Sequence, residues 1–322
     1  MWLRLRKSRI GFALSVIALV LATAACDGTD GKLDAVRTFA QNAITAQPAF
    51  TAIAADFYAS CVRTYYWASG AGETTDTLMN WCGTGTNPPK HALEAMQLWQ
   101  KTNSVLLSYI SGLGALAGGQ GSASDYGIPQ FTTEITQLAH VTNNQTDVAA
   151  ANAVSKFSDW IISSYFAERR REELTKVTAE ADQYVQSLTA SLSDIATKRY
   201  GDQLFLEAQE LDSFYAKYLP PSTAGAVSPQ PQPALSNPVL IVDVLAYRQQ
   251  WIRDRQTLAE RYEAIDAYVD ALDKIAKGHS GLVKALQASR LSNPAVAGQL
   301  LADFNRDVTM LSHAYQMTGG AR

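Results

Sequence analysis

The sequence predicts an all-α protein, an elongated helical bundle drawn out into a long antiparallel hairpin with coiled-coil character. Two segments, 174–195 and 244–272, repeat apolar residues about every 3.5 positions. This period indicates a coiled coil, although an ordinary amphipathic helix with a period of about 3.6 differs little over such lengths. Strand patterns, in which apolar and polar residues alternate, are hard to find. A proline-rich stretch between the two segments favours a hairpin.

Helical patterns also precede the hairpin. Residues 31–62 predict a helix with a kink or break at Pro48, because proline lacks the amide hydrogen that a helix interior needs. A second helix is expected over 88–117, opened by two prolines and weakened by Gly112 and Gly114. Beyond it lie a glycine-rich loop and two further helical patterns that lead toward the hairpin.

The hairpin is expected over 172–278, with its tip in the proline-rich stretch 220–238. Its arms should pair antiparallel. A flexible linker between two domains is the alternative, but each apolar stripe would then need a separate partner. The stripe positions are Leu174, Val177, Ala181, Val185, Leu188, Leu192, Ile195, Leu211, Phe214 and Tyr218 in the first arm, and Val244, Tyr247, Trp251, Leu258, Tyr262, Ile265, Val269 and Leu272 in the second.

The chain therefore divides into four parts. Gly278 is interpreted as the C-terminal cap of the second arm, with His279 beside the negative end of that helix. The expected parts are a signal peptide at 1–25, a membrane-proximal helical bundle at 26–171, the hairpin at 172–278, and C-terminal helices at 279–322 that pack back on the body.

The first 25 residues have the order of an export signal. Four basic residues come first, followed by an apolar run at 10–22 and a small-residue cleavage site. The apolar run is shorter than the roughly 20 residues of a transmembrane helix. An uncleaved membrane anchor is the alternative to a removable leader.

The TAAC sequence at 23–26 resembles the lipobox of bacterial lipoproteins, although Thr23 stands where leucine is usual. The resemblance implies that Cys26 becomes the N-terminus and carries acyl chains such as palmitate, which anchor the protein to the membrane. Ordinary signal peptidase cleavage before Ala25 is the alternative. Asp27 resembles the residue that retains enterobacterial lipoproteins in the inner membrane, and both the inner and the outer membrane stay open.

The cysteine count fits a lipoprotein. The chain has three cysteines, and lipidation of Cys26 leaves Cys61 and Cys82 as an even pair in a compartment that permits disulfides. A redox pair usually sits closer, as C-x-x-C, so the wide spacing predicts a structural disulfide. Four aromatic residues near this loop are expected to cover the core or to form an interaction surface: Tyr65, Tyr66, Trp67 and Trp81.

Charge argues against nucleic acid as a partner. The full chain has 27 basic and 30 acidic residues, and loss of the four basic leader residues leaves 23 against 30, a net charge of −7. Binding to nucleic acid depends on neutralising phosphates, which an acidic body does poorly. The arginines at 169–171 are flanked by glutamates at helical spacing, so they predict a salt-bridged solvent face.

No motif in the sequence predicts a catalytic, cofactor or metal site. The GHSG sequence at 278–281 lacks the final glycine of a nucleophile elbow and follows a helical pattern rather than a strand. The GLGALA sequence at 112–117 follows a helix, so close helix packing is favoured over dinucleotide binding. Four scattered histidines show no ligand spacing, and Asp266, Asp270 and Asp273 are interpreted as a solvated face.

These observations predict a lipid-anchored protein of the cell envelope that acts as a non-enzymatic structural or interaction module. Its partners would be the membrane, through the lipid, and an unidentified envelope protein or a second copy. One alternative is a pore-forming or membrane-perturbing protein that inserts the apolar segment 105–117. A periplasmic enzyme with a site assembled from distant residues is the other.

Overall fold

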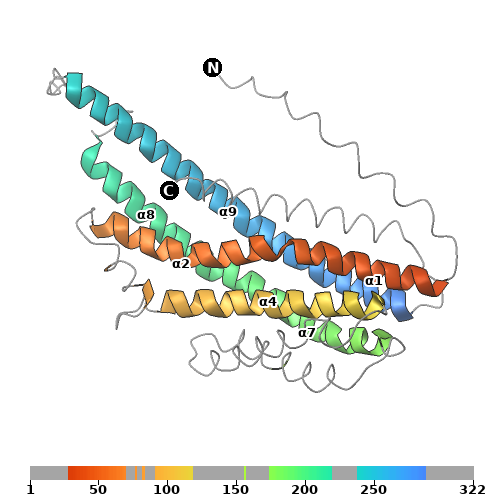
Figure 1. Ribbon diagram of the computed structural model, residues 1–322. Coiled ribbons are helices and arrows are strands. Elements are labelled where there is room, and N and C mark those ends of the chain that lie inside the picture. The colour runs from red at the N-terminus through yellow and green to blue at the C-terminus, as the bar shows by residue number, and fades with distance from the viewer. Residues whose placement is uncertain are drawn as a thin grey trace, which may run out of the picture.

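The computed structural model describes residues 28–69, 77, 82–83, 91–118, 156, 174–219 and 238–287. Its elements in these ranges are helical, which confirms the all-α class (Figure 1). The principal helices are α1 (Gly28–Thr45), α2 (Gln47–Ser69), α4 (His91–Gly118), α7 (Leu174–Asp194), the π-helical segment η3 (Ile195–Tyr200), α8 (Gly201–Tyr218) and α9 (Pro238–Gln287).

The predicted break near Pro48 is confirmed, because α1 ends at Thr45 and α2 begins at Gln47. Proline is the second residue of α2, where its missing amide hydrogen leaves no helical bond unmade. Close helix packing also explains Gly114 of α4. A side chain there would collide with the Cβ atom of Ala40 in α1, so only glycine lets these two helices approach so closely.

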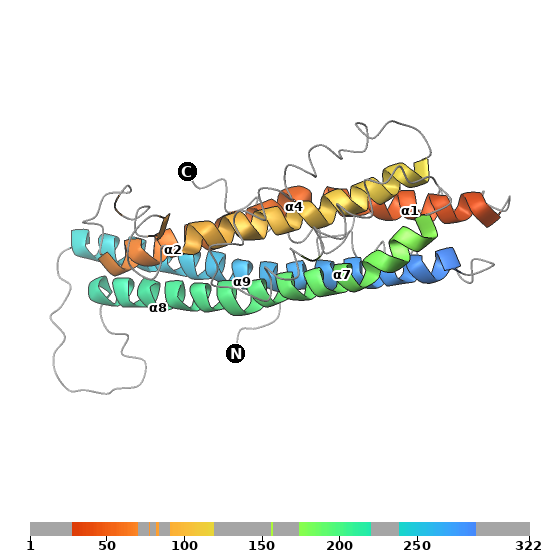
Figure 2. The same ribbon diagram turned by 90° about the horizontal axis from the view of Figure 1, so that it is seen from below.

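Helices α7, η3 and α8 form a nearly continuous rod that lies beside α9 (Figure 2). The rod and α9 run in opposite directions. Near one end His279 bonds to Asp182 of α7, and near the other Asp254 bonds to Tyr215 of α8. The 50 residues of α9 give it a length of about 75 Å at roughly 1.5 Å per residue.

The predicted end of the second arm at Gly278 is wrong. Helix α9 continues through Gly278 and ends at Gln287. The glycine makes room for a neighbour, since a Cβ atom at this position would lie 2.8 Å from Cε2 of Phe39 in α1. Consequently His279 lies buried inside the bundle and not at a helix end.

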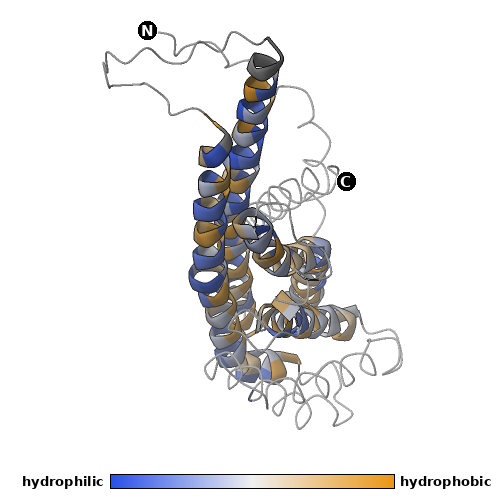
Figure 3. Ribbon diagram, turned by 90° about the vertical axis from the view of Figure 1, so that its left-hand side faces the viewer, coloured by the Kyte–Doolittle hydropathy of each residue, from blue (hydrophilic) through white to orange (hydrophobic). Residues whose placement is uncertain are grey.

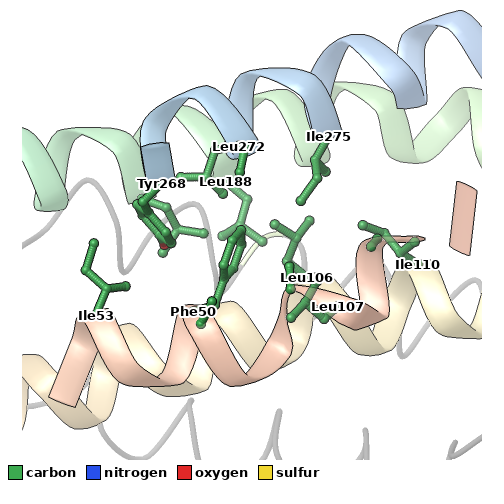
Figure 4. Close-up of a cluster of buried hydrophobic side chains, with 14 of the residues drawn as sticks. Phe50, Ile53, Leu106, Leu107, Ile110, Leu188, Tyr268, Leu272 and Ile275 are labelled. Carbon is green, nitrogen blue, oxygen red and sulfur yellow. The ribbon is translucent and has the colours of Figure 1, made fainter. Parts of the chain in front are cut away.

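The apolar core lies between α1, α2 and α4 on one side and α7 and α9 on the other. Figure 4 shows Phe50 and Ile53 of α2, Leu106 and Ile110 of α4, and Leu272 of α9 pointing into it. The stripe of the first arm faces this core throughout α7. Its buried positions are Leu174, Val177, Ala181, Val185, Leu188 and Leu192.

A chain of hydrogen bonds crosses the core and joins three helices. The indole nitrogen of Trp99 in α4 donates to the Tyr268 hydroxyl of α9 at 2.8 Å, and that hydroxyl donates to Asn103 Oδ1 at 2.7 Å. The Asn103 amide nitrogen in turn donates to the Phe50 carbonyl of α2 at 2.9 Å. The polar groups of this core chain are therefore satisfied.

The α8 end of the molecule is thinner. Figure 3 shows the first part of α9 extending past the end of α8, and both ribbons are largely hydrophilic with separate hydrophobic residues between. The end of α2 packs on α8, where the Trp67 ring lies 5.1 Å from Phe214. The side chains described over 243–257 of α9 include none that is buried, and burial begins at Leu258. We call α8 together with residues 238–257 of α9 the two-helix arm.

The start of α1 and the two-helix arm lie at opposite ends of the molecule (Figure 1). Contact between Phe39 of α1 and Gly278 of α9 fixes α1 beside the C-terminal end of α9. Within the described ranges, no helix combines the length and apolar character that crossing a bilayer requires.

Candidate functional site

The first candidate site consists of exposed apolar side chains on the two-helix arm and on the part of α9 that directly follows it. Isolated apolar residues on a surface are ordinary, but several lie together where residues 243–257 of α9 bury no side chain fully. The exposed members on α8 and α9 are Phe205, Leu206, Leu245, Tyr247, Ile252 and Tyr262. The apolar period of the second arm predicts that Tyr247 and Tyr262 are buried, whereas they are 43% and 37% exposed.

Aromatic residues at the end of α2 join this arm. The Trp67 ring lies 5.0 Å from Tyr66, 5.1 Å from Phe214 and 5.8 Å from Tyr215, measured between ring centroids. Tyr66 is 40% exposed, whereas Tyr65 is partly buried against the core. Trp67 thus packs α2 onto α8 and leaves Tyr66 at the surface. The fourth predicted aromatic residue, Trp81, lies outside the described residues.

Hydrogen bonds fix the register within the arm. The Trp251 indole donates to Asp212 Oδ1 at 3.0 Å, and the Tyr215 hydroxyl donates to Asp254 Oδ2 at 2.7 Å. Burial and the Asp254 carboxylate raise the pKa of Tyr215, so this hydroxyl stays protonated. Trp251, Asp254 and Tyr215 therefore hold α9 against α8.

The predicted disulfide between Cys61 and Cys82 is confirmed. Both cysteines are buried, with 2% and 0% exposure, and their Cα atoms lie 6.0 Å apart. The bond therefore ties residue 82 to the core side of α2, where reagents in solvent have little access to the sulfur atoms. Cys26, the proposed lipidation site, lies outside the described residues.

A buried cluster of charged residues joins α2, α8 and α9, and the sequence analysis missed it. Arg63 Nε contacts Glu207 Oε1 at 2.6 Å, and Arg261 Nη1 reaches the same oxygen at 3.0 Å. Asp56 accepts from Arg63 at 3.0 Å. Two arginines thus balance two carboxylates. We call these four residues the charge cluster.

Hydroxyl groups complete the charge cluster. Ser60 donates to Glu207 Oε2 at 2.6 Å, and Tyr200, the last residue of η3, donates to Asp56. Burial alone would raise the pKa of Asp56, but Arg63 and Arg261 hold that pKa below its ordinary value. Each carboxylate is neutralised by arginine, so the cluster is built to hold helices together and offers no general base.

A second polar group lies near the opposite end of the bundle. His279 Nδ1 bonds to Asp182 Oδ1 at 2.8 Å, and its Nε2 bonds to the Tyr109 hydroxyl at 2.9 Å. Ser280 donates to the same carboxylate at 2.9 Å. An Asp–His pair occurs in many hydrolases, but here the third partner is a tyrosine that is 1% exposed. The geometry joins α4, α7 and α9.

The described residues contain no group of three or more His, Cys, Asp or Glu side chains arranged to hold a metal ion. His91 begins α4, while His140 and His313 lie outside the described residues. Asp266, Asp270 and Asp273 are exposed along α9, and Asp273 forms an ion pair with Lys277 at 2.6 Å.

Acid is expected to destabilise the protein below about pH 4. The hydrogen bond from His279 is the main cause of the lowered pKa of Asp182, and arginines lower that of Asp56. A carboxylate with a depressed pKa stabilises the fold above its unfolded-state pKa, and this stabilisation is lost as the pH falls. Thermal denaturation between about pH 6 and pH 3 measures the loss. Asp182→Asn should lose less over this range than the unmodified chain, and an equal loss would contradict the assignment.

We found no protein-family model, curated protein or solved structure that matches this chain.

Proposed function

We propose that this chain is an exported lipoprotein, anchored in the cell envelope by acyl chains on Cys26, that acts as a non-enzymatic structural or protein-interaction module. The leader and the lipobox-like sequence at 23–26 support export and lipidation. The disulfide adds a further argument. Since Cys61 and Cys82 bond to each other, Cys26 is the one cysteine of the three left for another role.

The exposed two-helix arm is the observation that carries the interaction role. Residues 243–257 of α9 are bonded to α8 through Trp251 and Asp254, yet no side chain in this stretch is fully buried. We infer that α8 and α9 form an antiparallel coiled-coil-like hairpin whose outer part awaits a partner. Tyr66, Tyr247 and Ile252 are partly exposed large side chains of the kind that anchor protein interfaces.

Lipidation would place this arm away from the membrane. Only Asp27 separates Cys26 from Gly28, the first residue of α1, so the start of α1 must lie close to the lipid. The arm occupies the opposite end of the molecule (Figure 1). An α9 helix of about 75 Å directed away from the membrane would carry the arm well into the envelope.

The two alternatives gain less support. Residues 105–117, the proposed insertion segment, lie within α4, and Val105, Leu106, Ile110 and Leu113 are completely buried. Insertion would require the core to open and expose them. For an enzyme, the charge cluster and the His279 group place their most reactive side chains inside the bundle.

Replacing Cys26 with serine is expected to release the protein from membranes. Without the thiol no lipid can be attached, and no described helix offers a second membrane anchor. Fractionation of cells that express each form measures the change, with most unmodified protein in the membrane fraction and most Cys26→Ser protein outside it. Asp27→Asn is the matched control, since it alters the neighbouring residue without removing the thiol. Equal membrane association of Cys26→Ser and the unmodified chain would contradict the anchor.

A further inference from the structure

Five exposed residues of α9 are spaced seven positions apart and form a line along the helix. The line is apolar in its first part and acidic in its second. Its members are Leu245, Ile252, Ala259, Asp266 and Asp273, and each of them is exposed. Positions seven residues apart lie on one side of a helix, and apolar residues at this spacing form the seam of a coiled coil. The first three are apolar, and the last two are acidic.

This line points away from the helices that α9 already contacts. Trp251, Asp254 and Arg261 bond to Asp212, Tyr215 and Glu207 of α8, so they mark the side of α9 that faces the first arm. Ile252 follows directly after Trp251 and is 43% exposed. Among the residues that the structure describes, none is bonded to Leu245 or Ile252, and we call the apolar half of the line the seam.

We propose that a second copy of this chain covers the seam, so that two α9 helices pair in parallel through Leu245, Ile252 and Ala259. The proposal rests on the lipoprotein function, because lipid anchoring gives two copies the same orientation and the same height above the membrane. A two-fold axis along the membrane normal then brings each residue opposite itself. The resulting contact joins the two-helix arms of neighbouring molecules.

Two features favour a second copy over the bilayer as the occupant of the seam: the distance of Ile252 from the membrane and the negative charge on the rest of the line. Ile252 lies 35 residues before the end of α9, or about 50 Å along the helix from the end beside α1. With α9 directed away from the membrane, as proposed, the anchoring bilayer does not reach it there. Asp266 on the lower part of the line would face its own copy across the two-fold axis, and like charges repel. Pairing is thus confined to the apolar upper part.

The seam is too short to pair two free molecules, so pairing needs both copies to be anchored in one membrane. Leu245 to Ala259 covers only two heptads, too little for a stable coiled coil between free molecules. Anchoring both copies in one bilayer raises their effective concentration, which can strengthen binding by about 10²-fold or more. We therefore expect pairing on membranes and mostly monomers in the Cys26→Ser protein.

Disulfide crosslinking of the lipidated full chain in phospholipid vesicles tests the proposal. The variant Ile252→Cys places a thiol on the seam. Asp270→Cys is the matched control, because 18 residues, or five helical turns of about 3.6 residues, put it on the same exposed side lower on α9. Cys61 and Cys82 are already bonded, so they do not compete.

Mild oxidation should give at least about tenfold more covalent dimer from Ile252→Cys than from Asp270→Cys, since only the upper seam is in contact. Adding Leu245→Lys to Ile252→Cys should reduce the dimer to the control level, with circular dichroism confirming that the helices remain. Equal crosslinking of the two cysteine variants, or no dimer from either, would overturn the pairing.

The mass of the N-terminal peptide from the same vesicle sample separates this proposal from the lipoprotein function. Acyl chains on Cys26 without an Ile252→Cys dimer would leave the anchor standing and overturn the pairing. An unlipidated N-terminus in protein purified from membranes would overturn both.

Discussion

Replacing Glu207 with alanine is expected to lower the free energy of unfolding by about 3–5 kcal/mol. Glu207 is 3% exposed and contacts Arg63 at 2.6 Å and Arg261 at 3.0 Å. Its removal leaves the buried Arg261 and the partly buried Arg63 facing Asp56 alone, so one charge is uncompensated. Chemical denaturation measures the effect as a fall in the transition midpoint.

Glu180→Ala provides the matched control for Glu207→Ala. Glu180 also forms an ion pair on the first arm, with Lys176 at 3.9 Å, but both side chains are exposed. Surface pairs of this kind contribute about 0–1 kcal/mol. If both variants lose a similar small amount, the charge cluster does not stabilise the contact between α2, α8 and α9 as we infer.

Replacing both Cys61 and Cys82 with serine is expected to lower the free energy of unfolding by about 3 kcal/mol. The disulfide closes a loop with a sequence separation of 21 residues, and its removal lets the unfolded chain gain conformational entropy. For a protein of this size the melting temperature should fall by roughly 5–10 °C. Calorimetry or circular dichroism measures it.

Membrane attachment of the Cys61→Ser, Cys82→Ser double variant should be unchanged, because the proposed lipid sits on Cys26. The single variant Cys26→Ser is the converse control, which should lose the membrane and keep its melting temperature. Two freely alkylated thiols in native protein would contradict a structural disulfide between Cys61 and Cys82. A double variant that is as stable as the unmodified chain but has lost function would also contradict it.

Local patterns predicted the helices well because their causes lie within a few residues. The period of the first arm predicted α7 and its buried face, and Pro48 predicted the boundary between α1 and α2. Glycine predicted helix ends less well than proline did. Gly278 ends no helix and instead makes room for Phe39, which is far away in sequence, and no local pattern reveals such a neighbour.

Contacts between distant segments account for what the sequence analysis missed. Glu207 meets Arg63 across 144 positions of sequence. A charged residue inside an apolar stripe, such as Arg261 between Leu258 and Ile265, was the available signal. The stripe of the second arm predicted burial along its whole length, but burial begins only at Leu258, which leaves Tyr247 exposed. Tyr262 is exposed for another reason, because the neighbouring Arg261 takes the buried position that faces α8.

The most direct test of a lipid-anchored protein is the mass of its mature N-terminal peptide, isolated from the membrane fraction of cells that make the unmodified chain. Lipidation at Cys26 fixes which end of the molecule lies at the membrane and directs the two-helix arm away from it. We predict a peptide that begins at Cys26 and carries acyl chains on that residue. A peptide with a free, unmodified N-terminus at Ala25 or Asp27 would contradict the account.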